Sequence, residues 1–253
     1  MNFPEPLLLG TLLRRYQRFL ADVRLDSGET VTAHCTNTGS LKTCAEPGWR
    51  VALSRSPNPK RKLAFTWELV HNGQVWIGIN THLANHLAEE AIRQGWIPEL
   101  AGWAELQRER RYGENSRIDL LLRDGDKLCY VEVKNVTLLG EDGCLCFPDA
   151  VTERGRKHLG ELSRMVAAGH RAAMLYVVQR GDGGGFRPAH EIDPAYAAAL
   201  AEAAGAGVEI LAYRARVGLD GIELRDRLAL HPSLPVAASR LSGYSSGVGK
   251  EAM

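Results

Sequence analysis

The chain has 253 residues, of which 45% are hydrophobic, and its formal net charge is +1 at pH 7. Such a chain can bury the core of one large or two small globular domains. It holds no run of about eighteen apolar residues and no positively charged segment before the short apolar patch near its N-terminus, so we predict neither a membrane partner nor a signal peptide and expect a cytoplasmic protein.

Short strand-like segments separated by turns fill the first third of the chain. They cover residues 16–25, 30–35, 49–54, 63–70 and 75–79, and Ser27-Gly28 and Asn72-Gly73 mark two of the turns. Five short strands are typical of a small closed barrel, because closure leaves no exposed edge. We therefore predict an OB-like β-barrel over residues 1–80.

Basic residues alternate with aromatic residues in this predicted barrel. Residues 1–80 hold ten Lys and Arg against six Asp and Glu, whereas residues 81–230 hold nineteen against twenty-three. A basic groove with aromatic platforms is a common way for OB-folds to bind nucleic acid. The predicted contacts are Arg14, Arg15, Arg18, Lys60, Arg61 and Lys62. The alternative is that the aromatic rings face the barrel core and the cations are simply solvated.

Helices alternate with strands after residue 80. Helices are predicted over 81–94, 152–168 and 194–204, and strands over 107–112, 118–122, 128–133, 171–179 and 208–215. A strand, a helix and a second strand joined by short connections place the two strands in parallel. The predicted fold class is therefore α+β or α/β with two domains: the barrel, an α/β domain over residues 81–230, and then a flexible tail over 231–253.

Two carboxylates and a lysine lie on a predicted hairpin in the second domain. Asp119 is on its first strand, and Glu132 and Lys134 are on its second, where they share one face while Val131 and Val133 point to a core. Two carboxylates can share one Mg²⁺ or Mn²⁺, and a lysine beside them can orient an attacking water or neutralise charge on a phosphate. We predict Asp119, Glu132 and Lys134 as catalytic residues. The alternative is an exposed cross-strand ion pair.

Basic side chains crowd the first turns of the predicted helix over 152–168. Cations there oppose the helix dipole, which indicates an anionic partner such as a phosphate. Arg154, Lys157 and His158 are therefore further predicted nucleic-acid contacts.

The five cysteines do not indicate a disulfide scaffold or a zinc site. Their number is odd and their density is low, so reduced thiols are expected. Cys144 and Cys146 are separated by one residue, closer than the usual zinc pair, and no second pair matches them.

Six long segments resemble the sugar fermentation stimulation protein (SfsA) family over nearly the full chain. They are GTLLRRYQRFLADV from Gly10, HCTNTGSL from His34, NPKRKLAFTWELV from Asn58, YGENSRIDLLL from Tyr112, YVEVKNVTL from Tyr130 and FPDAVTERGRKHLGEL from Phe147. Thr36 stands where the family usually has Pro, and Leu41 stands where it usually has Met.

The resemblance implies a DNA-binding protein in which an N-terminal OB-fold precedes a PD-(D/E)xK nuclease-like, or restriction-endonuclease-like, domain. It also implies a third metal ligand on the helix before the first strand of that domain, and the aligned residue is Glu90. The implied metal set is thus Glu90, Asp119 and Glu132.

Two functions follow as competing predictions. One is a Mg²⁺-dependent nuclease, and the other is a DNA-binding regulator of sugar (maltose) metabolism genes that keeps the nuclease fold but does little chemistry. A sugar-related enzyme ranks last, because the sequence has no Gly-rich phosphate loop and no Ser/His/Asp signature. The polar segment 34–41 has no assigned role, since it could bind an anion or close a barrel corner.

Overall fold

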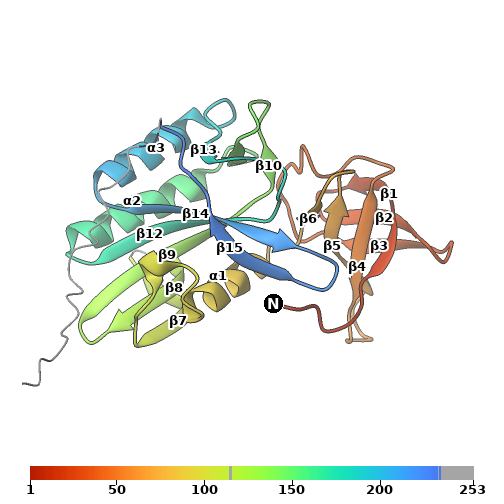
Figure 1. Ribbon diagram of the computed structural model, residues 1–253, viewed down its shortest axis with the longest axis horizontal. Coiled ribbons are helices and arrows are strands. Elements are labelled where there is room, and N and C mark those ends of the chain that lie inside the picture. Colours follow the sequence, from red (N-terminus) through yellow and green to blue (C-terminus); the bar gives the residue numbers. More distant parts are fainter. Residues whose placement is uncertain (114–115, 233, 235–253) are drawn as a thin grey trace, which may run out of the picture.

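The protein has two lobes in this computed structural model, which describes residues 1–113, 116–232 and 234 (Figure 1). The predicted flexible tail lies almost wholly outside the described residues. Within the described ranges, no helix is long and apolar enough to cross a membrane.

The N-terminal lobe is a closed barrel with the strand order of an OB-fold. Its strands are β1 (Leu8–Tyr16), β2 (Leu20–Leu25), β3 (Thr30–His34), β4 (Arg50–Arg55) and β5 (Phe65–His71). Antiparallel pairs run in the order β3-β2-β1-β4-β5, and parallel pairing of β3 with β5 closes the ring. A sixth strand, β6 (Trp76–Gly78), pairs with β5 and leads toward the second lobe. The β3–β5 pairing closes the ring, and β6 is the end strand of this sheet.

One predicted barrel strand is wrong. The sequence pattern predicted a single strand over 16–25, but β1 ends at Tyr16 and β2 begins at Leu20. Gln17 and Arg18 form the turn between them with φ angles of 48° and 64°. Residues other than glycine seldom adopt positive φ, so nothing in the sequence indicated a turn at these two residues.

The second lobe contains a six-stranded mixed sheet in the order β15-β14-β12-β9-β8-β7. Its strands are β7 (Glu105–Tyr112), β8 (Ser116–Asp124), β9 (Lys127–Val136), β12 (Arg171–Val178), β14 (Glu209–Val217) and β15 (Ile222–Arg227). β9, β12 and β14 run parallel to one another. The sequence pattern of strand, helix and strand predicted this for β12 and β14. The other pairs are antiparallel, and β15 was not predicted.

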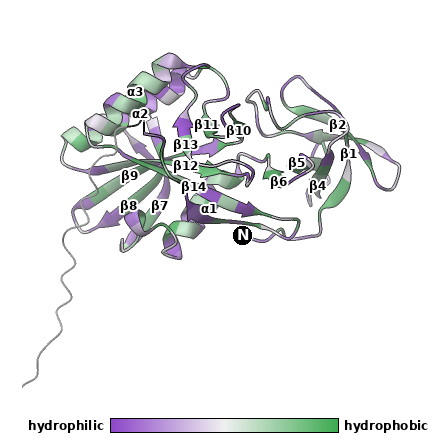
Figure 2. Ribbon diagram, turned by 45° about the horizontal axis from the view of Figure 1, so that its top comes forward, coloured by the Kyte–Doolittle hydropathy of each residue, from purple (hydrophilic) through white to green (hydrophobic). Residues whose placement is uncertain are grey.

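Helices cover both faces of this sheet (Figure 1). α1 (Leu83–Arg93) packs on one face in a core that includes Leu87 and Val131, while α2 (Glu153–Ala167) and α3 (Pro194–Gly205) pack on the other in a core that includes Leu159 and Leu200. Figure 2 shows α3, most of whose residues are alanine, largely in hydrophobic colours. Smaller elements are the turn η1 (Pro98–Leu100) and a sheet of β10 (Leu138–Leu139), β11 (Leu145–Phe147) and β13 (Phe186–Pro188).

A buried polar group, which we call the Arg180 cluster, joins the two lobes. Its members are Arg180, Asp182, Thr137 and, from the barrel lobe, Thr43. The Arg180 guanidinium is 1% exposed and forms two hydrogen bonds of 2.7 Å with the Asp182 carboxylate. It also donates to the Thr137 carbonyl at 2.6 Å and to the Thr43 hydroxyl at 2.8 Å. Charge and hydrogen-bond geometry therefore fix the barrel against the second domain.

The segment 34–41, which the sequence left without a role, is a second tie between the lobes. Arg15 donates to the carbonyls of Asn37, Gly39 and Ser40 at distances between 2.8 and 3.1 Å. The Ser40 hydroxyl donates to Asp149, just before α2. A Cβ atom at Gly39 would clash with the Asp149 carboxylate, so this approach requires glycine.

Candidate functional site

Asp119 lies where β8 separates from both of its neighbours. Regular β7–β8 pairing continues on either side of Asp119, but Glu109, which lies opposite, has a φ of 52°. Ile118 and Leu120, the residues next to Asp119, belong to the cores on opposite faces of the sheet. An irregularity of this kind re-aims side chains and is common beside active sites. The simple alternation of faces that the sequence suggested therefore fails at Asp119.

The Asp119 carboxylate connects three elements. Oδ2 accepts a hydrogen bond of 2.8 Å from the backbone N–H of Val133 on β9, and Oδ1 accepts one of 2.9 Å from Asn85 Nδ2 on α1. Regular β8–β9 pairing begins one residue later, at Leu120 with Val131. The carboxylate thus replaces a ladder hydrogen bond at the point where the two strands part.

Glu132 and Lys134 face α2, as the alternation along β9 predicted. Val131 and Val133 enter the opposite core, with α1. Lys134 Nζ lies 2.6 Å from Glu132 Oε1, and the same oxygen contacts His158 Nδ1 of α2. The Glu132 side chain is only 2% exposed. This burial excludes the alternative of an exposed cross-strand ion pair.

The two carboxyl groups have opposite pKa shifts. Burial raises the pKa of Asp119, and the nearby charge of Glu132 raises it further. Burial also acts to raise the pKa of Glu132, but the hydrogen bond from His158 and the charge of Lys134 outweigh it and leave the pKa below its ordinary value. Glu132 is therefore the carboxylate that stays charged, while Asp119 holds its charge less readily.

The donor set fits a divalent cation that takes two protein carboxylates. Glu132 Oε2 is buried and has no hydrogen-bond partner among the described residues, whereas Oε1 is shared by Lys134 and His158. Buried carboxylate oxygens are normally paired. Mg²⁺ commonly binds one or two carboxylates and keeps several waters, so Asp119 with Glu132 Oε2 suits it. Within the described ranges there is no cluster of three or more His, Cys, Asp or Glu side chains with metal-binding geometry.

Glu90 does not join this pair. Its Oε2 accepts a hydrogen bond of 2.7 Å from the N-terminal amine of Met1, which lies beside β15. Asn85, more than one turn earlier on α1, is the residue that reaches Asp119. The expected set of three metal ligands is thus corrected to two, because the rotation of α1 against β8 turns Glu90 to another side.

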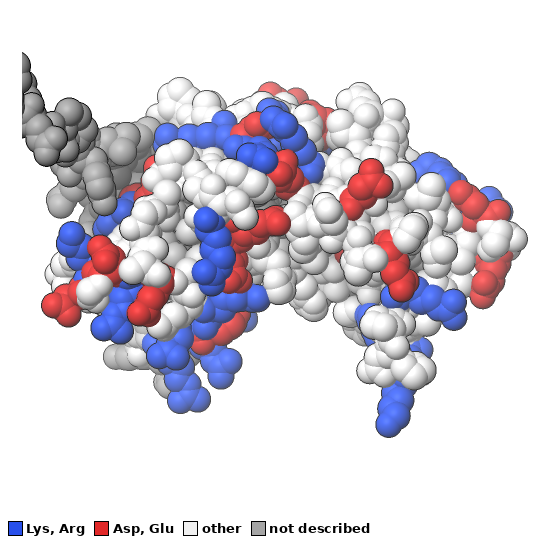
Figure 3. Space-filling view, turned by 60° about the horizontal axis from the view of Figure 1, so that its bottom comes forward, with Lys and Arg blue, Asp and Glu red and all other residues white. Residues whose placement is uncertain are grey.

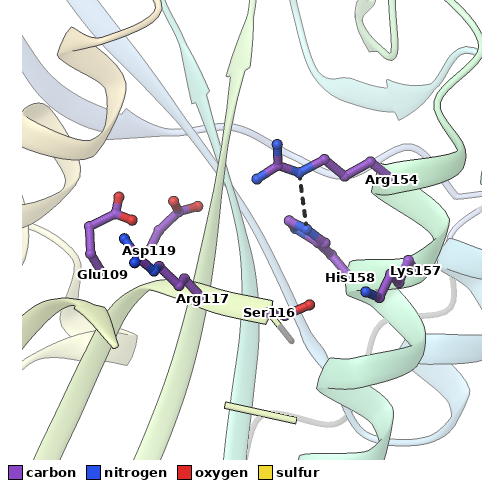
Figure 4. Close-up of a pocket in the computed structure, with 7 residues that line it drawn as sticks. All are labelled: Glu109, Ser116, Arg117, Asp119, Arg154, Lys157 and His158. Carbon is purple, nitrogen blue, oxygen red and sulfur yellow. Dashed lines mark hydrogen bonds between the residues drawn. The ribbon is translucent and has the colours of Figure 1, made fainter. Parts of the chain in front are cut away.

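A pocket of about 510 Å³ opens beside Asp119 (Figure 4). β7 and β8 supply one wall and α2 supplies the other, and the lining residues are Glu109, Ser116, Arg117, Asp119, Arg154, Lys157 and His158. Arg154 and Lys157, both predicted as nucleic-acid contacts, are exposed here. The structure therefore brings these two cations to the same pocket as Asp119.

His158 has a different place from the one predicted. It is buried, its Nδ1 contacts Glu132, and its Nε2 lies 3.4 Å from Arg154 Nε. A neutral imidazole that donates from Nδ1 and accepts at Nε2 satisfies both contacts. His158 thus positions Glu132 and Arg154 and has no free edge for a phosphate.

The predicted barrel contacts divide into exposed and engaged residues. Arg15 is engaged with backbone carbonyls, and Arg61 donates to Thr66 at 2.8 Å and contacts His34, so both serve the fold. Arg14 lies over the Tyr16 ring. Four predicted cations are exposed, namely Arg14, Arg18, Lys60 and Lys62, and of these Arg14 is paired with Asp22. On the face drawn in Figure 3, Lys and Arg gather on both lobes.

Sequence reasoning missed several polar residues at the site. Glu161 of α2 is fully buried, and its Oε1 accepts a hydrogen bond of 2.7 Å from Ser116 of β8. Glu161 Oε2 and the Tyr112 hydroxyl are buried without partners among the described residues. One signal was available, since Glu161 adjoins Leu162 and follows Leu159 on the apolar side of the helix. Asn85 gave no signal, because its role depends on how α1 crosses β8.

Two family models match the two lobes. Residues 13–79 match the model described as "SfsA N-terminal OB domain", and residues 82–221 match "Sugar fermentation stimulation protein RE domain". Together they cover most of the chain and confirm an OB-like barrel followed by a restriction-endonuclease-like α/β domain.

Curated relatives and a solved structure agree with these matches. The chain is 57% identical over 230 residues to a sugar fermentation stimulation protein homolog of Geotalea uraniireducens, covering 91% of this chain and 99% of that protein. It is 58% identical over 228 residues to the homolog of Geobacter sulfurreducens, covering 90% and 97%. The structure of Pyrococcus furiosus SfsA in complex with Ca²⁺ is similar with a TM-score of 0.83 and 30% identity, covering 91% of this chain and 98% of that one.

Proposed function

This chain belongs to the sugar fermentation stimulation protein (SfsA) family, and we propose that it binds DNA and hydrolyses phosphodiester bonds with a bound divalent cation, Mg²⁺ or Mn²⁺. The observation that carries the proposal is the unpartnered Oε2 of buried Glu132, with Asp119 close enough to sense its charge and Lys134 at 2.6 Å from its other oxygen. A buried carboxylate with one free oxygen is costly unless a cation binds it.

Each side chain has a stated task in this proposal. Asp119 and Glu132 hold the cation, which lowers the pKa of water and offsets charge on the phosphate when bound. Lys134 orients the attacking water and stabilises negative charge that develops on the phosphate. Asn85 and the Val133 N–H hold Asp119 in place. His158 fixes Glu132, in the way that outer hydrogen bonds orient the ligands of metal sites.

Cations outside the centre supply the grip on the polymer. Arg154 and Lys157 border the pocket, and Arg18, Lys60 and Lys62 are exposed on the barrel. Phosphate contacts of this kind position nucleic acid without reading its sequence. The Ca²⁺ in the similar Pyrococcus furiosus structure supports the expectation of a hard cation with oxygen ligands.

The direct test compares two lysines of one strand. Lys134→Ala removes the amine beside Glu132, and Lys127→Ala removes an exposed amine at the start of β9 as the matched control. With single- and double-stranded DNA and RNA in Mg²⁺ or Mn²⁺, we expect cleavage by the wild type and by Lys127→Ala. We expect Lys134→Ala to be slower by about 100-fold or more. EDTA should stop all cleavage.

Equal and negligible cleavage by all three proteins in the presence of metal would refute the nuclease. The second candidate function, a DNA-binding regulator with an inactive nuclease fold, would then stand if a salt-dependent gel shift remains. One observation favours that candidate: α1 turns Glu90 away, so the site has two carboxylates where the family resemblance implied three.

A further inference from the structure

The pocket between β7–β8 and α2 has an unusual balance of charge. Three cationic side chains, Arg117, Arg154 and Lys157, line it together with two carboxylates, Asp119 and Glu109. Figure 4 shows that Arg117 comes from the β8 wall, whereas Arg154 and Lys157 come from α2 on the other side. Like charges on facing walls repel one another, and an anion between them removes that cost.

The three cations have few contacts within the fold. Among the described residues none accepts a hydrogen bond from the Arg117 side chain, and Arg154 contacts only His158, through Nε. Lys157 Nζ is 3.9 Å from Glu161, beyond hydrogen-bonding distance. All three residues are exposed. They differ in this from Arg180, whose three guanidinium nitrogens all donate to protein oxygens.

The local backbone keeps the pocket open beside the carboxylates. Glu109 holds a φ of 52° in the middle of β7, a conformation that is strained for a residue other than glycine. This irregularity lies opposite Asp119, where β8 also leaves its regular pairing with β9. The sheet is thus opened at the level of the candidate metal ligand, on the side where the cations gather.

Size and lining define what can enter. A volume of about 510 Å³ lies within the range of pockets for ligands of nucleotide size. The lining residues come from a hairpin and a helix, and a pocket of this volume suits one nucleotide better than a base pair with its two strands. Among the described lining residues the only ring is that of His158, whose two nitrogens are engaged, so these residues offer no free aromatic ring on which a base could stack.

We propose that this pocket takes one unpaired nucleotide of a single-stranded nucleic acid through its phosphates, and that Arg117, Arg154 and Lys157 hold those phosphates without sequence preference. The inference rests on the proposed function, since it places the bound strand next to Asp119 and Glu132. It adds the substrate class, single-stranded over double-stranded, and one residue, Arg117, that sequence reasoning did not select. Enzymes that do chemistry on a base inside a pocket likewise act on single strands or extrude the nucleotide from the duplex.

The test measures binding without metal, so that it does not depend on cleavage. Labelled single strands of two unrelated sequences and the matching duplex are titrated in EDTA and followed by fluorescence anisotropy. The variants are Arg117→Ala, Arg154→Ala and Lys157→Ala, with Arg123→Ala on an exposed part of β8 as the control. Arg117→Lys and Arg154→Lys, which keep the charge, should retain most of the affinity that the alanine variants lose.

We expect both single strands to bind equally well and the duplex to bind at least about tenfold more weakly. Each pocket variant should weaken single-strand binding about tenfold and lower the slope of log affinity against log salt by about 0.7. Arg123→Ala should change neither. Unequal binding of the two sequences, tighter duplex binding, or affinity that the pocket variants leave unchanged would overturn the proposal.

Failure of the pocket and failure of the nuclease give different results. If single strands bind as expected but no polymer is cleaved in Mg²⁺ or Mn²⁺, the pocket assignment holds and the hydrolytic function fails. If duplex DNA is cleaved faster than single strands and Arg117→Ala leaves the rate unchanged, the hydrolytic function holds and the pocket assignment fails.

Discussion

The second domain contains two buried charged groups that differ in how completely they are satisfied. In the Arg180 cluster, each guanidinium nitrogen donates to an oxygen of Asp182, Thr43 or Thr137. Beside β9, Glu132 is equally buried, yet its Oε2 is left without a partner. Burial of charge alone therefore does not mark a functional site. Seven buried side-chain atoms of the described residues lack a hydrogen-bond partner, and Glu132 Oε2 is distinguished among them by a second carboxylate, Asp119, and by Lys134 at 2.6 Å from its other oxygen.

The largest expected effect is a loss of stability when the Arg180 cluster, in which every guanidinium nitrogen has a partner, is disrupted. Arg180→Ala leaves Asp182 buried and unpaired and removes the donor to the Thr137 carbonyl. We expect the free energy of unfolding to fall by about 3–5 kcal/mol. Chemical denaturation measures this. Arg50→Ala is a matched control, since Arg50 pairs with Asp26 by two similar hydrogen bonds on the surface, and we expect it to cost less than about 1 kcal/mol. Equal losses for the two variants would contradict the comparison.

The next largest effect is expected on cation binding, when the carboxylate pair of Asp119 and Glu132 is changed. Asp119→Asn keeps an acceptor for the Val133 N–H but removes one of the two charges. Because burial and Glu132 raise the pKa of Asp119, its ionised form is unfavourable without metal. In EDTA we expect the free energy of unfolding to stay within about 1 kcal/mol of the wild type or to rise.

Added Mg²⁺ should separate the two proteins. A cation that binds only the folded state stabilises it, by about 2.7 kcal/mol at a concentration 100 times its Kd. We expect this stabilisation in the wild type and its loss in Asp119→Asn, as measured by thermal unfolding with and without Mg²⁺. Equal stabilisation of Asp119→Asn and the wild type by Mg²⁺ would show that Asp119 is not a ligand of the cation.

A smaller effect is expected from Arg15, whose two terminal nitrogens donate to backbone carbonyls although the sequence pattern predicted it as a nucleic-acid contact. Arg15→Ala leaves three carbonyls of the 37–40 segment without their donor, and we expect a loss of about 1–3 kcal/mol in the free energy of unfolding. Arg14→Ala on the same strand is the control, because its partner Asp22 keeps hydrogen bonds from Tyr16 and Thr32. A larger loss of unfolding free energy for Arg14→Ala than for Arg15→Ala would contradict the structural role of Arg15.

The smallest effect concerns Glu68, a buried carboxyl that has hydrogen bonds from Ser54 and Asn80 but no ion pair. Burial raises its pKa above the ordinary value of 4.5. The folded state therefore holds its proton more tightly than the unfolded state, and this contribution to stability is lost as the pH rises from 4.5 through the folded-state pKa. We expect the difference in unfolding free energy between Glu68→Gln and the wild type to shift in favour of the variant over that range. A constant difference would contradict the shifted pKa.

The sequence was sufficient wherever local patterns decide the structure. Alternation along β9 placed Glu132 and Lys134 on one face and the two valines on the other, and Thr152 begins α2 as its pattern indicated. The parallel pairing of β12 with β14 followed from short connections. The segments shared with the SfsA family located the barrel and the second domain before any geometry was known.

Other features required the packed structure. A positive φ at Gln17, Arg18 and Glu109 leaves no mark in the sequence, because these residues reach it only under tertiary constraint. The exposure of each cation was equally hidden, since Arg15 and Arg18 differ in role although they are three residues apart.

The sequence by itself thus determined the two domains, the family and the carboxylates with their lysine, since periodicity and local motifs are properties of neighbours along the chain. Only the tertiary structure decided that Asn85 reaches Asp119 while Glu90 does not, that His158 serves Glu132, and that Glu132 Oε2 has no partner. Those outcomes depend on how α1 and α2 are rotated against the sheet, and that rotation is set by the packing of both cores at once.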